Sequence, residues 1–290
     1  MATGRRAARQ RMKQVVTLGE LRQARADLKG PVGFVPTMGF LHEGHISLVK
    51  LARQDCASVV VSIFVNPAQF GSNEDLAAYP RDLTGDLSKL EAAGVDLVWL
   101  PTPDLVYPAG YNTWVNVEGV SQPLEGAARP GHFRGVATVV SKLFNAVQPQ
   151  KAYFGQKDAQ QVAVIKQMVR DLNFPIDIVV VPTLREADGL AMSSRNTYLS
   201  PDERKAAAVL FRSLQAAKQA YAAGERDAEA LRNVMHATLE AEPLAMPIYV
   251  SCADPGSLLE LQRIEHGALL SMAVRIGKTR LIDNIQVFGA

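Results

Sequence analysis

The chain has 290 residues, of which 48% are apolar and 21% charged, and its 31 basic and 29 acidic residues leave a formal net charge of +2. These values are typical of a globular protein that is long enough to bury a core without disulfides. They exclude fibrous, disordered and disulfide-stapled proteins, and the near-neutral charge gives no indication of a nucleic-acid or membrane partner.

Strand-like and helix-like segments alternate through the first part of the chain. We expect strands over 32–36, 58–65, 96–100 and 176–181, and helices over 45–53, 82–93, 135–147 and 160–172. The run SVVVSIFV at 58–65 is rich in β-branched residues, which is typical of a parallel strand covered on both faces. This order predicts an α/β fold with a doubly wound parallel sheet, in which ligands lie beyond the carboxyl ends of the strands.

The C-terminal part has a different pattern. Helices are expected over 201–223 and 228–241, and strands over 247–253 and 269–276, followed by a final segment over 279–285. Helices followed by strands favour a smaller α+β domain. The sequence therefore predicts a basic disordered extension over 1–14, a doubly wound domain over 15–186 and a second domain over 187–290.

No apolar run is long enough for a membrane span or for the hydrophobic part of a secretory signal, so a cytoplasmic protein is expected. The two cysteines, Cys56 and Cys252, have neither CxxC nor framework spacing. This favours a reducing compartment, and both are expected to be ordinary buried thiols.

The strongest chemical signal is PTMGFLHEGH at 36–45, between an expected strand and an expected helix. Gly39 and Gly44 allow a tight turn, and the free N–H groups of a helix N-terminus can bind phosphate. His42 and His45 are three residues apart and would lie on one side of the helix start. A zinc site is the alternative, but the HExxH pattern needs its second histidine four positions after the first rather than three.

Four further loops carry polar side chains. FGQKD at 154–158 and LAMSSRN at 190–196 bring a lysine, two serines and an arginine, which suit phosphate recognition. NPAQFG at 66–71 brings the Gln69 amide, which can donate and accept and so suits a hydroxy acid. RPGHFRG at 129–135 brings arginine and histidine before a helix, which suits an anion. Each loop alone is equally explained as a solvated cap or an ordinary Gly/Pro loop.

Taken together, the motifs resemble the pantoate–β-alanine ligase (pantothenate synthetase) family. They include VPTMGFLHEGH, IFVNPAQFG, YPRD, RPGHFRGV, FGQKDAQQ, LAMSSRN and TRLIDNI, and they extend from about residue 15 to the C-terminal strands. The resemblance implies a Rossmann-like domain of the nucleotidylyltransferase type with a smaller lid domain, and usually a homodimer. It implies that pantoate and β-alanine are joined with ATP and Mg²⁺ through pantoyl adenylate, with release of AMP and pyrophosphate.

The resemblance also implies roles for individual residues. The expected catalytic residues, interpreted as a cluster of cations around a polyphosphate, are His42, His45, Lys157 and Arg195. The expected ATP-binding residues are Pro36, Thr37, Met38, Gly39, His42, His45, Gly155, Gln156, Lys157, Asp158, Leu184, Met192, Ser193, Ser194 and Arg195. Pantoate and β-alanine are expected at Gln69, Gln161, Asn66, Arg129 and His132. Asp86 is the expected Mg²⁺ contact, but Gly85 replaces the adjacent acid of many relatives, so ATP phosphates are expected to hold most of the metal.

Three other functions remain open from the sequence. The first is a nucleotidylyltransferase that moves AMP onto a phosphorylated substrate. The second is a metal hydrolase that uses His42, Glu43 and His45, and the third is a nucleotide sensor without turnover. Gln69, Gln161 and the MSSR loop at 192–195 argue against the nucleotidylyltransferase.

Overall fold

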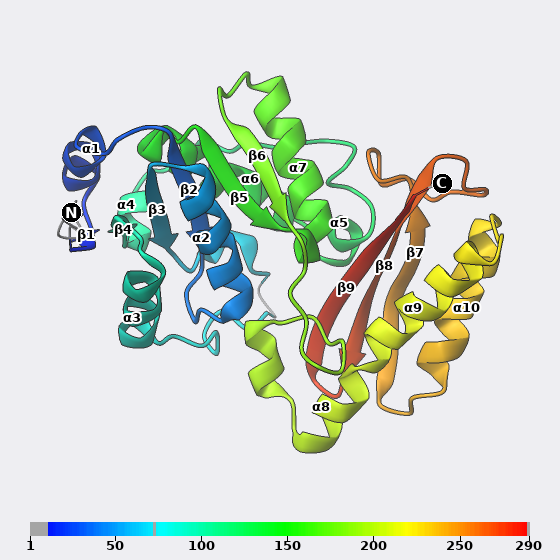
Figure 1. The fold of residues 1–290 in the computed structure, drawn as a ribbon. Coiled ribbons are helices and arrows are strands. Elements are labelled where there is room, and N and C mark those ends of the chain that lie inside the picture. Colours follow the sequence, from blue (N-terminus) through cyan, green and yellow to red (C-terminus); the bar gives the residue numbers. More distant parts are fainter. Residues whose placement is uncertain (1–10, 72–73, 289–290) are drawn as a thin grey trace, which may run out of the picture.

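A computed structural model describes residues 11–71 and 74–288 (Figure 1). Its larger sheet is six-stranded and entirely parallel, in the order β1-β4-β3-β2-β5-β6. In this spatial order the strands are β1 (Lys13–Val15), β4 (Leu97–Trp99), β3 (Ser58–Ile63), β2 (Val32–Thr37), β5 (Lys151–Gly155) and β6 (Asp177–Val181). The chain order reverses between β2 and β5, which is the switch point where such sheets bind ligands.

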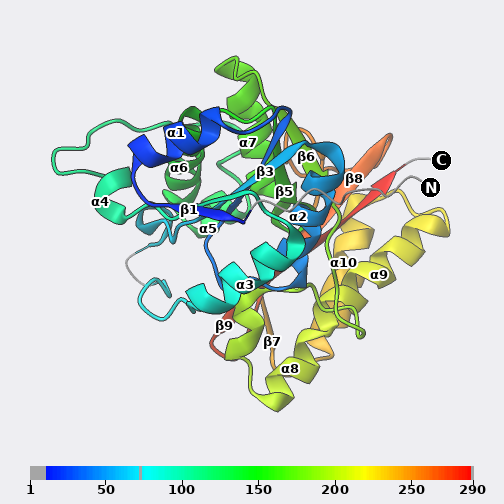
Figure 2. The same cartoon turned by 60° about the vertical axis from the view of Figure 1, so that its left-hand side comes forward.

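Helices cover both faces of this sheet (Figure 1 and Figure 2). They are α1 (Leu18–Ala26), α2 (Glu43–Asp55), α3 (Leu83–Ala93), α4 (Pro103–Val106), α5 (Glu125–Ala128), α6 (His132–Val147) and α7 (Ala159–Asp171), with short 3-10 turns η1 (Pro67–Gln69) and η2 (Gln156–Asp158). Successive strand residues face opposite sides. Phe34 and Val60 therefore pack with α1, α6 and α7, whereas Val35 and Val59 pack with α2 and α3.

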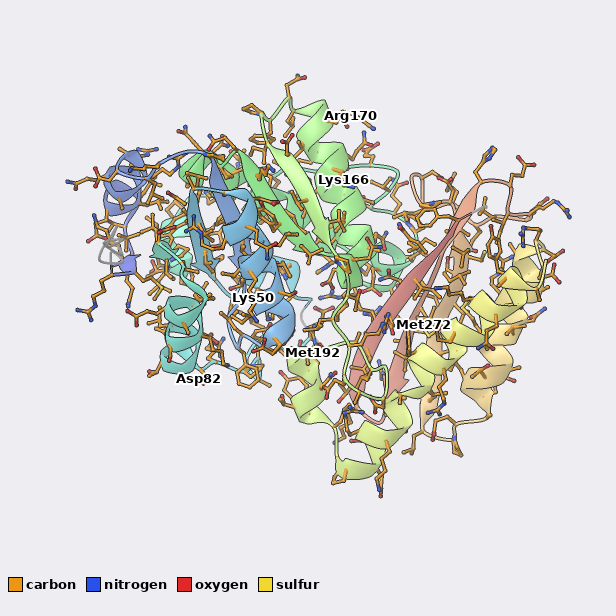
Figure 3. All side chains as sticks on the ribbon, in the orientation of Figure 1. Lys50, Asp82, Lys166, Arg170, Met192 and Met272 are labelled. Atoms are coloured by element: carbon orange, nitrogen blue, oxygen red, sulfur yellow. The ribbon has the colours of Figure 1, made fainter. Side chains whose placement is uncertain are left out.

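The second domain is a three-stranded antiparallel sheet, in the order β7-β8-β9, with helices on one face. After the 3-10 turn η3 (Ser194–Tyr198), its elements are α8 (Pro201–Ala207), α9 (Val209–Ala222), α10 (Ala228–Glu240), β7 (Ala245–Ala253), β8 (Gly267–Ile276) and β9 (Thr279–Phe288). Met272 of β8 is buried in a core shared with Leu214 of α9 and Leu231 of α10 (Figure 3). The β9 strand lies nearest the larger domain and contacts η2.

The structure confirms the predicted fold class, and every predicted strand and helix in chain order is present within a few residues of its expected ends. Cys56 and Cys252 are free and buried, as expected. The predicted helix at 201–223 is two helices, because a tight turn at Ala208 separates α8 from α9. The predicted domain boundary falls in the connection between β6 and α8, and it stays a prediction.

Two strands were missed. The β5 strand occupies the centre of the sheet, but its apolar run Ala152–Phe154 is too short to show a period. The predicted disordered extension is wrong at its end: Met12 is buried, and Lys13 and Gln14 belong to β1, which pairs with β4. The rest of that prediction, over 1–10, lies outside the described residues. Within the described part of the chain, no helix combines the length and apolarity needed to cross a bilayer.

Candidate active site

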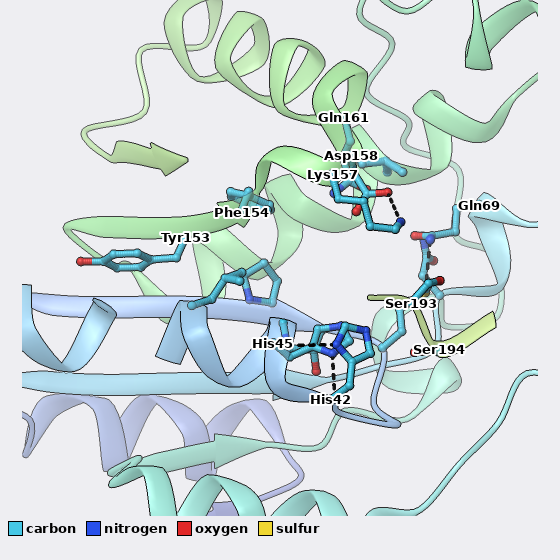
Figure 4. A pocket seen from close by; sticks show the side chains of 18 of the residues that line it. His42, His45, Gln69, Tyr153, Phe154, Lys157, Asp158, Gln161, Ser193 and Ser194 are labelled. Carbon is cyan, nitrogen blue, oxygen red and sulfur yellow. Dashed lines mark hydrogen bonds and ion pairs between the residues drawn. The ribbon is translucent and has the colours of Figure 1, made fainter. Parts of the chain in front are cut away.

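A cavity of about 240 Å³ opens at the carboxyl edge of the parallel sheet (Figure 4). Its walls come from segments that follow β2, β3, β5 and β6, and from the start of α6. Parallel strands end on the same edge of a sheet, so loops that are more than a hundred residues apart in sequence meet there. The cavity is therefore built where the sequence predicted a ligand.

The structure brings nearly all of the predicted site residues to this cavity. Those that line it are Pro36, Thr37, Met38, His42, His45, Asn66, Gln69, Arg129, His132, Gly155, Lys157, Asp158, Gln161, Leu184, Met192, Ser193, Ser194 and Arg195. The predicted residues that do not line it are Gly39, Gln156 and Asp86. The roles of the lining residues stay predictions, but their convergence is now a property of the fold.

The two histidines are held by the backbone of their own turn. His42 is the N-cap of α2, and its Nδ1 accepts the N–H of Gly44 at 3.1 Å. The Nδ1 of His45 accepts the N–H of His42 at 3.3 Å, and the two ring centroids are 4.1 Å apart. A Cβ on Gly44 would lie only 2.8 Å from the His42 ring, so a larger residue here would displace that ring. Since both Nδ1 atoms accept, each neutral ring carries its proton on Nε2 and can donate from there.

These rings are donors rather than cations. Burial lowers the pKa of His42 to about 4, with a further contribution from Lys157. Burial also lowers the pKa of His45 to about 3, with a contribution from the neighbouring His42 ring. Both imidazoles are therefore neutral at pH 7, and the expected cationic cluster is wrong in this respect: its positive charge comes from Lys157 and Arg195.

Asp86 binds the backbone of the turn that carries the histidines. Its buried carboxylate accepts the backbone N–H groups of Phe40 at 2.7 Å and Leu41 at 2.6 Å. Lys89, one turn further along α3, donates to the carbonyl of Leu41 at 2.6 Å. This helix therefore clamps the turn that carries the histidines. Asp86 does not line the cavity and both of its oxygens accept backbone N–H groups, so its geometry is that of a backbone anchor, and its Mg²⁺ contact stays a prediction.

The positive charge in the cavity comes from two other segments, those that carry Lys157 and Arg195. Lys157 follows β5 and has its ammonium 3.4 Å from the carboxylate of Asp158. Arg195 lies in η3, in the connection between β6 and α8, and its guanidinium makes two hydrogen bonds to Asp75, at 3.1 and 2.9 Å. Ser193 caps the short turn that contains Arg195, through the Arg195 N–H. Lys157 thus lies across the cavity from the histidine turn (Figure 4), and Arg195 lines the same cavity.

A polar network surrounds Gln69. The Asn66 amide donates to the Gln69 side-chain oxygen at 3.0 Å and to the carbonyl of Gly135 at 3.2 Å, and its oxygen accepts from Tyr107. His132 Nδ1 lies 2.8 Å from the Gln69 carbonyl and therefore carries the ring proton. Burial, followed by the nearby Arg129 charge, lowers the pKa of His132 to about 4. Asn66 and His132 thus hold Gln69 in place.

Sequence reasoning missed the acidic partners of the two arginines. Arg129 is paired with Glu74 through two contacts of 2.6 Å, and Arg195 with Asp75. Both acids lie in the loop between η1 and α3, which has no regular structure to predict from. The adjacent positions of Glu74 and Asp75 in the sequence could have indicated this, because two neighbouring acids can pair with two arginines from different segments.

The geometry defines a class of protein. A helix N-terminus with two imidazole donors, together with a lysine and an arginine at the switch point of a parallel sheet, suits a nucleoside triphosphate. The fold and the site therefore define a nucleotide-using enzyme built on a doubly wound parallel sheet. Among the described residues there is no group of three potential metal ligands, and both His Nδ1 atoms are used by the backbone, which argues against the zinc hydrolase alternative.

Comparison with known proteins gives the particular family. The model of the pantoate-beta-alanine ligase family matches residues 10–286, and the chain belongs to this family. A pantothenate synthetase of Herpetosiphon aurantiacus is 63% identical over 275 residues, which cover 94% of this chain and 99% of the relative. One of Chloroflexus aurantiacus is 63% identical over 274 residues, covering 94% and 97%.

Solved structures agree. The pantothenate synthetase of Thermus thermophilus superposes with a TM-score of 0.92 at 49% identity, covering 96% of this chain and all of that one. The ligase of Francisella tularensis, solved with "Beta-gamma ATP" and β-alanine, gives 0.78 at 35% identity, covering 94% and 97%. The chain is thus an acid–amine ligase that condenses pantoate with β-alanine in an ATP-dependent reaction through pantoyl adenylate. This replaces the nucleotidylyltransferase and sensor alternatives.

Proposed function

We propose that His42, His45, Lys157 and Arg195 together stabilise the phosphates of ATP during formation of pantoyl adenylate. The two histidines and the two cations line the same cavity, with Lys157 across from the histidine turn (Figure 4). Charge develops on the non-bridging and leaving oxygens as pyrophosphate departs, so fixed donors at these atoms lower the barrier. The observation that carries this proposal is the neutral, backbone-anchored histidine pair facing Lys157.

The rest of the nucleotide is assigned to the adjoining walls. We place the nucleoside between the turn after β2 and the segment after β6. The residues proposed to contact it are Pro36, Thr37, Met38, Gly155, Asp158, Leu184 and Met192, with Ser193 and Ser194 at the phosphates. Gly39 and Gln156 do not line the cavity, so their contribution is to shape the backbone. Gly39 has φ +83°, and a Cβ there would lie 3.1 Å from Asp86.

Pantoate is assigned to Gln69 and Gln161. The Gln69 oxygen is used by Asn66, and the partner of its amide nitrogen among the described residues is the sulfur of Met38, at 3.2 Å. A thioether is a weak acceptor, so the Gln69 N–H groups are free for a hydroxyl or a carboxylate. The fixed orientation of this amide favours a ligand that accepts hydrogen bonds. Arg129 and His132 contribute by holding the Gln69 segment from behind.

The chemistry then needs no covalent enzyme intermediate. The pantoate carboxylate oxygen forms a bond to the α-phosphorus while the bond from that phosphorus to the pyrophosphate oxygen breaks. The neutral β-alanine amine next attacks the acyl carbon, AMP leaves with the bridging oxygen, and the amine proton passes to solvent. The protein supplies position and charge stabilisation in both steps.

Mg²⁺ is proposed to arrive with ATP. The described residues offer no ready cage of three acidic, histidine or cysteine ligands, and Asp86 is engaged by the backbone. Mg²⁺ binds readily through phosphates and water with few protein ligands. The metal supplies neutralising charge on the triphosphate when bound.

The domain assignment is likewise a proposal. Residues 15–186 form the nucleotide-binding body and residues 187–290 the cover, and a cleft of about 1030 Å³ between them shares Lys157 and Arg195 with the smaller cavity. A homodimer and a cytoplasmic location are proposed from the family. Light scattering on the purified protein tests the dimer, and fractionation of the source cells tests the location.

One assay tests the proposed reaction course. With ATP and pantoate but no β-alanine, the enzyme should release pyrophosphate up to about one equivalent per site, and AMP should appear only after β-alanine is added. A requirement for β-alanine before any pyrophosphate appears would refute the adenylate-first order. A requirement for a phosphorylated acceptor would refute the ligase function itself.

A further inference from the structure

The C-terminal motif TRLIDNI has no assigned role in the reaction, yet it connects the two domains. It forms the first part of β9, the strand of the second domain nearest the body (Figure 1). Arg280 pairs with Glu125 of α5 through contacts of 2.5 and 2.8 Å. Two strand periods later on the same face, Asn284 reaches the turn that carries Lys157. This face of the strand therefore touches the body through Arg280 and through Asn284, and the second contact lies next to the active site.

Asn284 binds the backbone of η2 directly. Its side-chain nitrogen donates to the carbonyl of Gln156 at 3.0 Å and to the carbonyl of Lys157 at 2.8 Å. Its oxygen accepts from the Gln156 amide at 3.2 Å. Asn284 is 4% exposed, so water cannot readily replace these bonds. A primary amide is the smallest side chain with two donors in a plane, which matches two successive carbonyls.

The strand itself is fixed on its other face. Asp283 is buried and accepts two hydrogen bonds from Arg185, at 2.6 and 2.9 Å. Arg185 also donates to the carbonyls of Asn284 and Gly189, and its guanidinium lies 4.1 Å from the ring centroid of Phe211. The backbone of Asn284 is thus anchored independently of its side chain, so the side chain can act as a fixed support.

We propose that Asn284 is a positioning residue, which holds the backbone of Lys157 so that the ammonium reaches the ATP phosphates. The inference rests on the proposed role of Lys157. Loss of the support lets η2 shift, and a displacement of about 1 Å at a catalytic group can cost about a hundredfold in rate. The second domain therefore contributes to adenylation from its anchored strand as well as by covering the cleft.

The experiment is a double-mutant cycle on single-turnover adenylation, with pantoate and ATP in the presence of excess enzyme. Asn284→Asp keeps the shape but places a carboxylate against two carbonyl oxygens, and Asn284→Ala removes the side chain without adding charge. Either change should slow adenylation at least about tenfold. In a Lys157→Met background the same change should have no further effect, because it acts through the ammonium that is already gone.

A matched control is Ser271→Ala. Ser271 is the cross-strand neighbour of Asn284 in β8, it is buried, and its hydroxyl has no hydrogen-bond partner within residues 11–71 and 74–288. This change should leave adenylation within about twofold of the unmodified rate. Thermal unfolding of each variant shows whether the two domains remain folded. If Asn284→Asp does not fold, Asn284→Ala carries the comparison.

The outcomes distinguish the role of Lys157 from the role of Asn284. If Lys157→Met leaves the adenylation rate unchanged, the proposed role of Lys157 fails. If Lys157→Met is slow but both Asn284 variants are fast, the positioning role alone fails. Equal slowing by the Asn284 change with and without Lys157 would show a general structural effect and would also overturn the positioning role.

Discussion

The anchoring of the histidine turn by Asp86 makes a quantitative prediction. In Asp86→Asn the side chain keeps its shape, but one oxygen becomes an NH₂ group that faces the N–H of Phe40 or Leu41. A hydrogen bond to a charged acceptor contributes about 1.5–3 kcal/mol, and a buried donor left unpaired adds a similar cost. We expect the free energy of unfolding to fall by about 2–4 kcal/mol, since one bond is lost and the other loses its charge.

Urea denaturation measures this difference, because an unchanged slope with a lower midpoint reports lost stability. Single-turnover adenylation measured against Mg²⁺ concentration separates the anchor from a metal ligand. The anchor role predicts a lower maximal rate, because His42 and His45 lose their fixed position, and an unchanged half-saturating Mg²⁺ concentration. A metal-ligand role predicts a higher half-saturating concentration instead.

Asp82→Asn is the matched control. Asp82 is the exposed N-cap of the same helix and accepts the N–H of Gly85 at 3.0 Å. Asparagine caps helices about as well as aspartate, so the change should cost no more than a few tenths of a kcal/mol. The reasoning would be refuted by a loss below about 1 kcal/mol for Asp86→Asn, or by a shift in its Mg²⁺ dependence.

Three further predictions concern the cavity. His45→Ala should slow adenylation at least about a hundredfold, typical of one lost transition-state donor, and an unchanged single-turnover rate would contradict this. Gln69→Ala should weaken pantoate binding and leave ATP binding intact, as measured by calorimetry with each ligand alone; unchanged pantoate affinity would refute the assignment. The pKa values of about 4 for His42 and about 3 for His45 in the folded protein lie below the unfolded value of about 6.5. At pH values between the folded and the unfolded pKa, the unfolded state therefore binds more protons than the folded state. The free energy of unfolding should therefore fall as the pH is lowered from about 6.5 toward 4, and NMR titration giving a ring pKa near 6.5 would contradict it.

Local sequence patterns were sufficient to predict most of the helices and strands. The β-branched run at Ser58–Ile63 and the helix periodicity of Glu43–Asp55 identify their elements without tertiary information. By contrast, β5 is too short for a period, and Lys13–Val15 becomes a strand only because β4 lies beside it. Such segments take their structure from partners that are distant in sequence, which local patterns cannot show.

The candidate site divides in the same way. The motifs themselves predicted the histidine turn, the lysine turn, the arginine loop and Gln69, because each carries its chemistry in a few consecutive residues. Their arrangement around one cavity required the parallel sheet, which places the ends of β2, β3, β5 and β6 on one edge.

The sequence by itself determined which side chains are available: two imidazoles, a lysine, an arginine and two amides in recognisable loops. Only the tertiary structure decided the protonation states of these side chains and the hydrogen bonds that hold them in place. Burial makes His42 and His45 neutral donors, since a desolvated ring disfavours the charged form. Long-range hydrogen bonds likewise turn Asp86 into a backbone anchor and bring Asn284 from the last strand to the Lys157 turn. These are contacts between residues 46 and 127 positions apart, and no local pattern encodes them.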